Sequence, residues 1–341
     1  MTPRERLDAM LDGRPVDRPP FFPALYDYKA ALAGVPPHLF GQDEASLLRA
    51  LRLEAAELHA EILTCTYDIY NIEAEALGAS LLRVSGLATP ELDEPLLHDL
   101  DQIHDLPVLT VPAGRMGIFI GAARALAAET GESIPVRGGL SGPFSLASKI
   151  YPDEQLLVDT LLDPEKVGRL LAWCNNLVQM YASAFLDAGA HGIAVFDSFI
   201  VPPMLSPAAY EEIVLPHHQR LFAFLKAQGA VHRALIAGGN TVPLLPALLK
   251  SGANQLLLDD TVPPEQASDI LAQYPGMLFR YNLRPTLLCN GSVDDVKKET
   301  EKVLTLMQGR KNFILGTGIL PAQNPRANIL AVREALLAFY A

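Results

Sequence analysis

The sequence predicts an α/β protein built as a single (β/α)8 barrel, the TIM-barrel fold. Short, nearly all-apolar segments alternate with amphipathic helical segments, a pattern typical of a parallel sheet that is covered on both faces. Eight such apolar segments occur in 341 residues, a number that favours a closed barrel. The predicted strands are residues 21–25, 62–67, 134–140, 192–196, 232–237, 255–258, 277–282 and 312–315.

Helix-start and helix-stop signals frame the segments between these strands. At the beginning of the chain, Thr2 can cap a helix, Pro3 suits its first position, and Glu5 completes a capping box. Further helices are predicted at residues 43–61, 163–188, 207–228, 242–251, 264–273 and 293–308. The alternative is a doubly wound open sheet, which is disfavoured because no Gly-x-Gly-x-x-Gly follows the first strand.

Residues 80–133 are less regular than the rest, with Pro95, Pro107 and Pro112 interrupting them. We predict that they form an irregular insertion between the second and third strands, able to cover the barrel mouth. The whole chain, 1–341, is then one domain.

The composition argues against several classes of protein. The formal net charge is −12, and a negative surface repels phosphate backbones, so no nucleic-acid partner is expected. No apolar run is long enough to cross a membrane, and the first residues do not resemble a signal peptide. Cys65, Cys174 and Cys289 are scattered, as expected for a protein of the reducing cytoplasm, and they form no local metal-binding spacing.

Polar residues and glycines follow seven of the eight predicted strands, where a barrel places its active site. They are Asp68, Ser141-Gly142, Asp197-Ser198, Gly238-Gly239-Asn240, Asp259-Asp260, Asn282 with Arg284, and Gly316-Thr317-Gly318. Carboxylates can move protons, amides can orient a ligand, and glycines let a ligand approach the backbone. The competing interpretation is that each residue simply caps the next helix or forms a turn, most plainly at Asp260.

The histidines give weaker evidence of a functional site than the residues at the strand ends do. His232 lies inside a predicted strand and is expected to be a core residue. His217 and His218 fall within a predicted helix and are expected to face solvent.

Several motifs, in the same order along the whole chain, resemble the uroporphyrinogen decarboxylase superfamily, which includes corrinoid methyltransferases. They are residues 4–6, 13–20, 68–78, 141–146, 196–198, 238–241, 282–285 and 315–320, with Asn324-Pro325 and Asn328. The resemblance implies a (β/α)8 barrel independently of the strand count. It also implies a small-molecule substrate, and, since the superfamily includes dimers, a homodimer.

The decarboxylase branch of the superfamily acts on uroporphyrinogen without a cofactor. Asp68 matches the aspartate thought to bind the pyrrole N–H groups, and Ser198 matches a second site residue. The arginine motif that holds substrate carboxylates in that branch is replaced here by residues 24–28. Among them, Asp27 carries a negative charge and cannot bind a carboxylate as an arginine does. Lys149 and Thr317 replace the site tyrosine and histidine of that branch.

The methyltransferase branch transfers methyl groups between a corrinoid protein and a thiol. Residues 73–76, 142–144 and 239–241 resemble this branch more closely. Its zinc ligands, however, correspond to Ile236, Gly238 and Thr317, none of which can hold zinc as the family does. The resemblance therefore implies no tightly bound cofactor, and a corrinoid presented by a partner protein.

The leading hypothesis is a zinc-independent, corrinoid-linked methyltransferase with its site at the carboxyl-terminal mouth of the barrel. Asp68, Glu73 and Asp197 are the candidate catalytic residues. The candidate substrate-binding residues are Tyr67, Gly142, Ser198, Asn240, Asp259, Asn282 and Thr317. Two alternatives stay open: a decarboxylase acting on a pyrrole or another small acid, and a non-catalytic barrel that binds a corrinoid, a tetrapyrrole or a partner.

Overall fold

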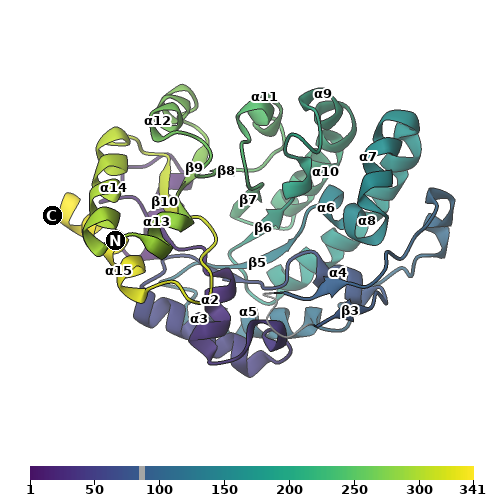
Figure 1. Ribbon diagram of the computed structural model, residues 1–341, viewed down its shortest axis with the longest axis horizontal. Coiled ribbons are helices and arrows are strands. Elements are labelled where there is room, and N and C mark those ends of the chain that lie inside the picture. The colour runs from purple at the N-terminus through teal and green to yellow at the C-terminus, as the bar shows by residue number, and fades with distance from the viewer. Residues whose placement is uncertain (84–88) are drawn as a thin grey trace.

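The protein is built around an eight-stranded, all-parallel sheet that curls strongly on itself (Figure 1). The computed structural model describes residues 1–83 and 89–341. The strand order is β1-β10-β9-β8-β7-β6-β5-β2. The strands are β1 (Phe21–Phe22), β2 (Leu63–Cys65), β5 (Val136–Ser141), β6 (Gly192–Phe196), β7 (His232–Ile236), β8 (Gln255–Leu258), β9 (Leu278–Leu283) and β10 (Phe313–Thr317).

Each of the eight predicted strands overlaps one strand of this sheet. The predicted strand 21–25 is shortened to Phe21–Phe22. Pro23 has no backbone N–H to continue the ladder, and Leu25 already precedes the next helix. The α/β architecture with eight parallel strands is therefore confirmed.

The two end strands, β1 and β2, form no ladder with each other. Hydrogen bonds span the seam between them. The Glu61 N–H donates to the Phe21 carbonyl at 3.1 Å, the Phe21 N–H donates to the Glu61 carboxylate at 3.2 Å, and the Lys29 ammonium donates to the Thr64 carbonyl at 2.8 Å. Lys29 also forms an ion pair with Glu54 at 3.5 Å. The side chains of Lys29, Glu54 and Glu61 are all buried. The sheet is therefore a TIM-like barrel whose ladder is interrupted at one seam.

Helices surround the outer face of the curled sheet (Figure 1). The α-helices are α1 (Pro3–Leu11), α2 (Tyr26–Ala33), α3 (Glu44–Leu58), α4 (Asn71–Ala76), α5 (Met116–Thr130), α6 (Pro143–Ile150), α7 (Asp153–Leu162), α8 (Pro164–Asp187), α9 (Pro207–Ala209), α10 (Leu215–Ala227), α11 (Leu245–Leu248), α12 (Pro264–Gln273), α13 (Pro285–Asn290), α14 (Val293–Leu306) and α15 (Arg326–Phe339). A π-helical turn, η4 (Tyr210–Val214), joins α9 to α10, and 3-10 turns occupy η1 (Pro37–Leu39), η2 (Leu100–Asp105), η3 (Ser198–Ile200) and η5 (Val242–Leu244). Within the described part of the chain, none of these helices combines the length and apolarity that a membrane span requires.

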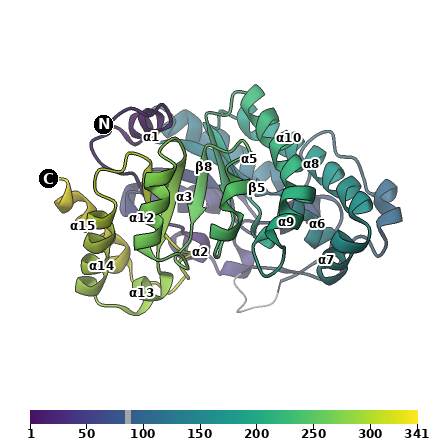
Figure 2. The ribbon, with the colours of Figure 1, turned by 90° about the horizontal axis from the view of Figure 1, so that it is seen from above.

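Helix α1 covers the amino-terminal end of the barrel. Its Leu7 and Met10 join a buried cluster with residues from the starts of four strands, namely Phe22, Ile62, Leu278 and Ile314. Figure 2 shows α1 on the opposite side of the molecule from α13, which follows the carboxyl end of β9. The carboxyl ends of the strands lie at the other end, which we call the mouth of the barrel.

The region 80–133 is more regular than predicted. It contains an antiparallel hairpin of β3 (Leu81–Leu82) and β4 (Glu91–Leu92), the turn η2, and the fifteen-residue helix α5. Helix α5 packs against α3, β2 and β5 as a barrel helix, so the prediction of irregular structure is wrong for residues 116–130. Residues 84–88 of the predicted insertion lie outside the described residues.

The buried Glu54 predicts a pH-dependent stability. Burial raises the pKa of Glu54 from 4.5 to about 7, although Lys29 opposes the shift. Because the native state holds this proton more tightly than the unfolded chain does, the free energy of unfolding should fall as pH rises from about 4.5 to about 7. Glu54 is expected to contribute about 3 kcal/mol to this fall in the free energy of unfolding. Urea denaturation across this pH window measures the fall. Glu54→Gln should flatten the profile. The surface variant Glu57→Gln should leave it unchanged, and parallel profiles for all three proteins would contradict the assignment.

Candidate functional site

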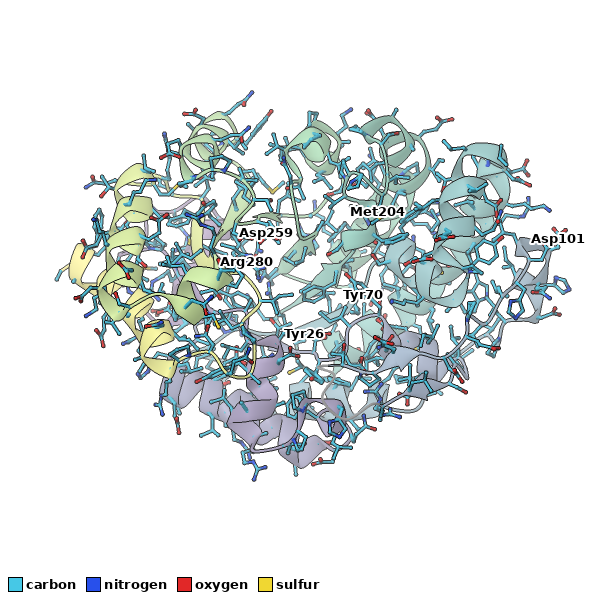
Figure 3. All side chains as sticks on the ribbon, in the orientation of Figure 1. Tyr26, Tyr70, Asp101, Met204, Asp259 and Arg280 are labelled. Carbon is cyan, nitrogen blue, oxygen red and sulfur yellow. The ribbon has the colours of Figure 1, made fainter. Side chains whose placement is uncertain are left out.

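The inner face of the sheet carries a polar patch at the mouth of the barrel. Side chains alternate between the two faces of a strand, so Asp259, just past β8, shares the inner face with Asn282 of β9. Figure 3 shows Tyr26, Tyr70, Asp259 and Arg280 around the centre of the curled sheet, whereas Asp101 lies at the edge of the molecule. These side chains come from the regions following β1, β2 and β8 and from β9 itself.

Asp259 and Asn282 form the best-defined polar pair of this patch. The Asp259 carboxylate accepts hydrogen bonds from the Gly239 N–H and from the Asn282 amide, each at 2.8 Å. Asp259 is half-buried, and the Oδ1 atom of the buried Asn282 has no hydrogen-bond partner within the described residues. The pair is therefore held in one orientation, and the half-buried Asp259 carboxylate keeps lone pairs that could accept hydrogen bonds from a ligand.

Two tyrosines that the sequence analysis did not select flank the mouth. The Tyr26 hydroxyl accepts the Ile69 N–H at 2.8 Å, and the Tyr70 hydroxyl accepts the Ser198 N–H at 3.3 Å. Burial raises the pKa of both phenols, so both stay protonated at neutral pH and can donate a hydrogen bond. Ser198, a predicted binding residue, accepts the Gly238 N–H at 3.0 Å through its hydroxyl.

Asp68 does not face an open pocket. Its carboxylate pairs with Arg115 at 2.6 Å and accepts the Asn71 amide at 2.6 Å, and the residue is only 1% exposed. Burial raises the pKa of Asp68, and Arg115 opposes that shift. Arg115 also pairs with Glu75, so both carboxylates are committed to one buried ion-pair network. Sequence reasoning missed Arg115 because it lies in the region predicted to be irregular.

The side chains of Glu73 and Tyr67 are likewise buried and hydrogen-bonded to other parts of the chain. The Glu73 carboxylate accepts the Ser141 N–H at 2.7 Å, and burial raises its pKa. Glu73 thereby fixes α4 to the carboxyl end of β5. The Tyr67 hydroxyl donates to the Pro37 carbonyl at 3.0 Å, and the ring is fully buried.

Asp197 caps a helix and anchors a histidine. Its carboxylate accepts the Ser145 N–H at 2.6 Å in the first turn of α6 and binds His218 Nε2 at 2.8 Å. The other ring nitrogen of His218 contacts the Tyr210 hydroxyl at 2.9 Å, and Asp197, His218 and Tyr210 are all 0% exposed. The prediction that His218 faces solvent is wrong.

The sequence contains a helical pattern that indicates the burial of His218. Val214, His218, Leu221 and Leu225 are spaced three or four residues apart, and all four are buried along one side of α10 and the π-helical turn before it. His232 is buried and contacts Gln255 at 2.7 Å, which confirms the core role expected for it.

The other predicted binding residues have local structural roles. The Thr317 hydroxyl accepts the Ala24 N–H at 3.0 Å and is fully buried, linking β10 to the chain after β1. The exposed Asn240 caps the following turn by accepting the Val242 N–H at 3.1 Å. Gly142 lies directly against Asp197. Of these positions, Asn240 fits the capping interpretation. Asp197 also caps a helix, but it is α6, which precedes it in the chain.

The positions matched to zinc ligands do not fit a zinc ion. Ile236, Gly238 and Thr317 offer one aliphatic side chain, no side chain and one committed hydroxyl. Nowhere in residues 1–83 and 89–341 do three or more His, Cys, Asp or Glu side chains cluster in a way that could hold a metal ion.

A separate surface pocket of about 210 Å³ lies near the ends of β8 and β9 and is lined in part by Asp260, Tyr281 and Arg284. Tyr281 alternates with the inward-facing Arg280 and Asn282, so this pocket is on the helix side of the sheet. It is distinct from the barrel mouth.

Comparison with known proteins identifies the family. The family model described as uroporphyrinogen decarboxylase (URO-D) matches residues 2–338. The chain belongs to the uroporphyrinogen decarboxylase family.

Relatives within this family include both of its activities. The chain is 28% identical to the methylcobamide:CoM methyltransferase MtbA of Methanosarcina acetivorans, covering 98% of this chain and 97% of that protein. It is 27% identical to a uroporphyrinogen decarboxylase of Geotalea daltonii, covering 92% of both. A solved methyltransferase structure from Methanosarcina mazei superposes with a TM-score of 0.86 over 100% of both chains at 21% identity, which supports the fold. Because these family members are enzymes, the comparisons favour an enzyme and leave the reaction open.

The contact between Gly142 and Asp197 predicts a strict requirement for glycine. A Cβ atom at residue 142 would lie 2.3 Å from the Asp197 Cβ and Oδ2 atoms. Gly142→Ala should therefore lower the free energy of unfolding by about 3 kcal/mol, measured by urea denaturation. The control is Gly168→Ala within α8, where an added Cβ meets nothing within 4 Å. That variant should gain about 1 kcal/mol, and equal effects at both positions would refute the packing argument.

The Asp68–Arg115 pair predicts a large cost for losing the cation. Arg115→Met leaves a buried carboxylate unpaired and should cost about 3–5 kcal/mol of unfolding free energy. The double variant Asp68→Asn/Arg115→Met should recover part of that loss. Arg52→Met breaks an ion pair whose side chains are 52% and 41% exposed, and it should cost less than about 1 kcal/mol. If Arg115→Met costs no more than Arg52→Met, Asp68 is not held by this pair and remains available to a substrate.

Proposed function

We propose that this protein is a methyltransferase whose small-molecule acceptor binds at the barrel mouth, against Asp259 and Asn282. The methyl donor would be a corrinoid presented by a partner protein, as the resemblance implies. The observation that carries the proposal is the half-buried Asp259 carboxylate, which the buried Asn282 and the Gly239 N–H hold in one orientation at the mouth. The catalytic role therefore moves from Asp68, Glu73 and Asp197 to Asp259.

The decarboxylase alternative is weaker because of Asp68. An aspartate that binds pyrrole N–H groups needs free carboxylate oxygens facing the substrate. Here Arg115 and Asn71 each bind one oxygen of Asp68 and the residue is only 1% exposed, whereas Asp259, which also has one donor on each oxygen, is half-buried. Decarboxylation of a pyrrole would require this network to open.

The proposed chemistry uses the side chains of the mouth as follows. A bond forms between the methyl carbon and the acceptor atom while the bond from that carbon to the donor breaks, and the electron pair stays with the donor. The proton of the acceptor passes to the Asp259 carboxylate and then to solvent. Asn282 and Gly239 hold this carboxylate in place, and the Tyr26 and Tyr70 hydroxyls are available to orient the acceptor.

Zinc independence is part of the proposal, and its support is the identity of the residues at the matched positions. Ile236, Gly238 and Thr317 supply no thiolate or imidazole. An acceptor would then lose its proton to a carboxylate rather than bind a metal ion.

The test is methyl transfer from methylcobalamin to a panel of small thiols, followed by mass spectrometry of the product and by loss of the methylcobalamin absorbance. Activity should persist after treatment with a chelator, in protein whose measured zinc content is far below one ion per chain. Asp259→Asn should lower kcat/KM at least about tenfold. The exposed control Asp269→Asn should leave it unchanged.

Three outcomes would contradict the proposal. Release of CO2 from uroporphyrinogen without methyl transfer would favour the decarboxylase. Activity that requires added zinc would refute the metal-free chemistry. Binding of cobalamin with no turnover of any substrate would favour the non-catalytic barrel.

A further inference from the structure

Two arginines lie buried inside the barrel, below the polar patch at the mouth. Arg137 is on β5 and Arg280 is on β9, and they are 1% and 5% exposed. Arg280 precedes Asn282 by two residues, so both side chains point to the inner face. Figure 3 shows Arg280 beside Asp259 near the centre of the sheet.

Both guanidinium groups meet at one aromatic ring. The central carbons of Arg137 and Arg280 each lie 4.8 Å from the ring centroid of Phe22 on β1. Neither β5 nor β9 is adjacent to β1 in the sheet, so these contacts cross the interior of the barrel. Gly316 makes room for Arg280, because a Cβ there would lie 2.9 Å from its side-chain carbons.

Neither arginine has a carboxylate partner within the described residues. Arg137 donates through Nε to the Thr64 hydroxyl at 2.7 Å, and its NH1 group has no partner. The Nε of Arg280 has none either. Glu54 is already paired with Lys29. The Asp259 carboxylate accepts hydrogen bonds from Gly239 and Asn282.

This arrangement is costly without a counter-ion. Burial lowers the pKa of Arg137 to about 9 and that of Arg280 to about 10, so both remain charged at neutral pH. Two buried like charges with unpaired donors are destabilising unless an anion or ordered water satisfies them. Stacking on one phenylalanine ring offsets only part of this cost. A ligand that brings negative charge would remove the deficit.

We infer that Arg137 and Arg280 form an anion subsite in the barrel interior, which binds the carboxylate group of a small molecule. The planar fork of a guanidinium matches a carboxylate better than it matches a neutral group. The inference deepens the proposed function and rests on it for the identity of the ligand: the methyl acceptor is a small acid. Its carboxylate lies deep in the barrel, and its reacting end lies at Asp259, nearer the mouth.

Binding can be tested without any methyl donor. The melting temperature and the heat of binding are measured with acetate, succinate and inorganic phosphate at constant ionic strength, with acetamide as the uncharged analogue of acetate. Acetate or succinate should raise the melting temperature, and acetamide should not. In Arg137→Met and Arg280→Met, Kd for the carboxylate should rise at least about tenfold, whereas the exposed control Arg124→Met should bind like the parent.

The methionine variants also give a readout that separates a binding role from a structural one. In buffer without carboxylates, removal of an unpaired buried charge should leave Arg280→Met at least as stable as the parent. If Arg280→Met is strongly destabilised and no anion stabilises the parent, the arginines are structural and the inference fails. A response to phosphate alone, or an equal response in Arg124→Met and both methionine variants, also overturns it. Carboxylate binding in the absence of methyl transfer would refute only the proposed reaction, and methyl transfer to neutral acceptors alone would refute only the subsite.

Discussion

The parallel pairing of all eight strands is the constraint on which the rest of this structure depends. Because every strand of the barrel runs in the same direction, residues as far apart as Asp68 and Thr317 follow their strands at one end of the molecule. The same pairing leaves β1 and β2 at the two edges of the ladder, where Lys29, Glu54 and Glu61 join them through buried polar contacts. The fold thus concentrates polar groups at its mouth and along one seam of its wall.

Sharing one end of a barrel does not make residues share a pocket. Asp68, Glu73 and Asp197 all follow strands or begin helices at the mouth, yet each points into the wall and is satisfied there by Arg115, Ser141 or Ser145. Such buried, paired carboxylates stabilise the connections between strands and helices. Asp259 differs because it is half-buried. It also lies beside an oxygen of Asn282 that has no partner among the residues the structure describes.

The sequence was sufficient to predict the strands, because apolar strand segments depend on local patterning. It also predicted that polar groups would gather at the strand ends. It could not predict which of those groups point inward. That direction depends on where each strand ends, because a shift of one residue turns a side chain to the other face of the sheet. Asp197 follows β6 directly and turns toward α6, whereas Asp259 follows β8 directly and turns inward. Arg115 was missed because its partner Asp68 is 47 residues away, and no local pattern links the two.

The inner face of the barrel shows how this chain differs from an ordinary apolar core. Barrel interiors are usually filled by branched aliphatic side chains, yet here Arg137, Arg280 and Asn282 occupy inward positions on β5 and β9. Within the described part of the chain, each of these three side chains carries a polar atom that has no hydrogen-bond partner. Imidazole, thiol and carboxylate groups are absent from the positions matched to zinc ligands, which are Ile236 on β7, Gly238 just after β7 and Thr317 at the end of β10. The polar groups of the interior therefore lie on β5, on β9 and directly after β8, and the proposed anion subsite depends on this placement.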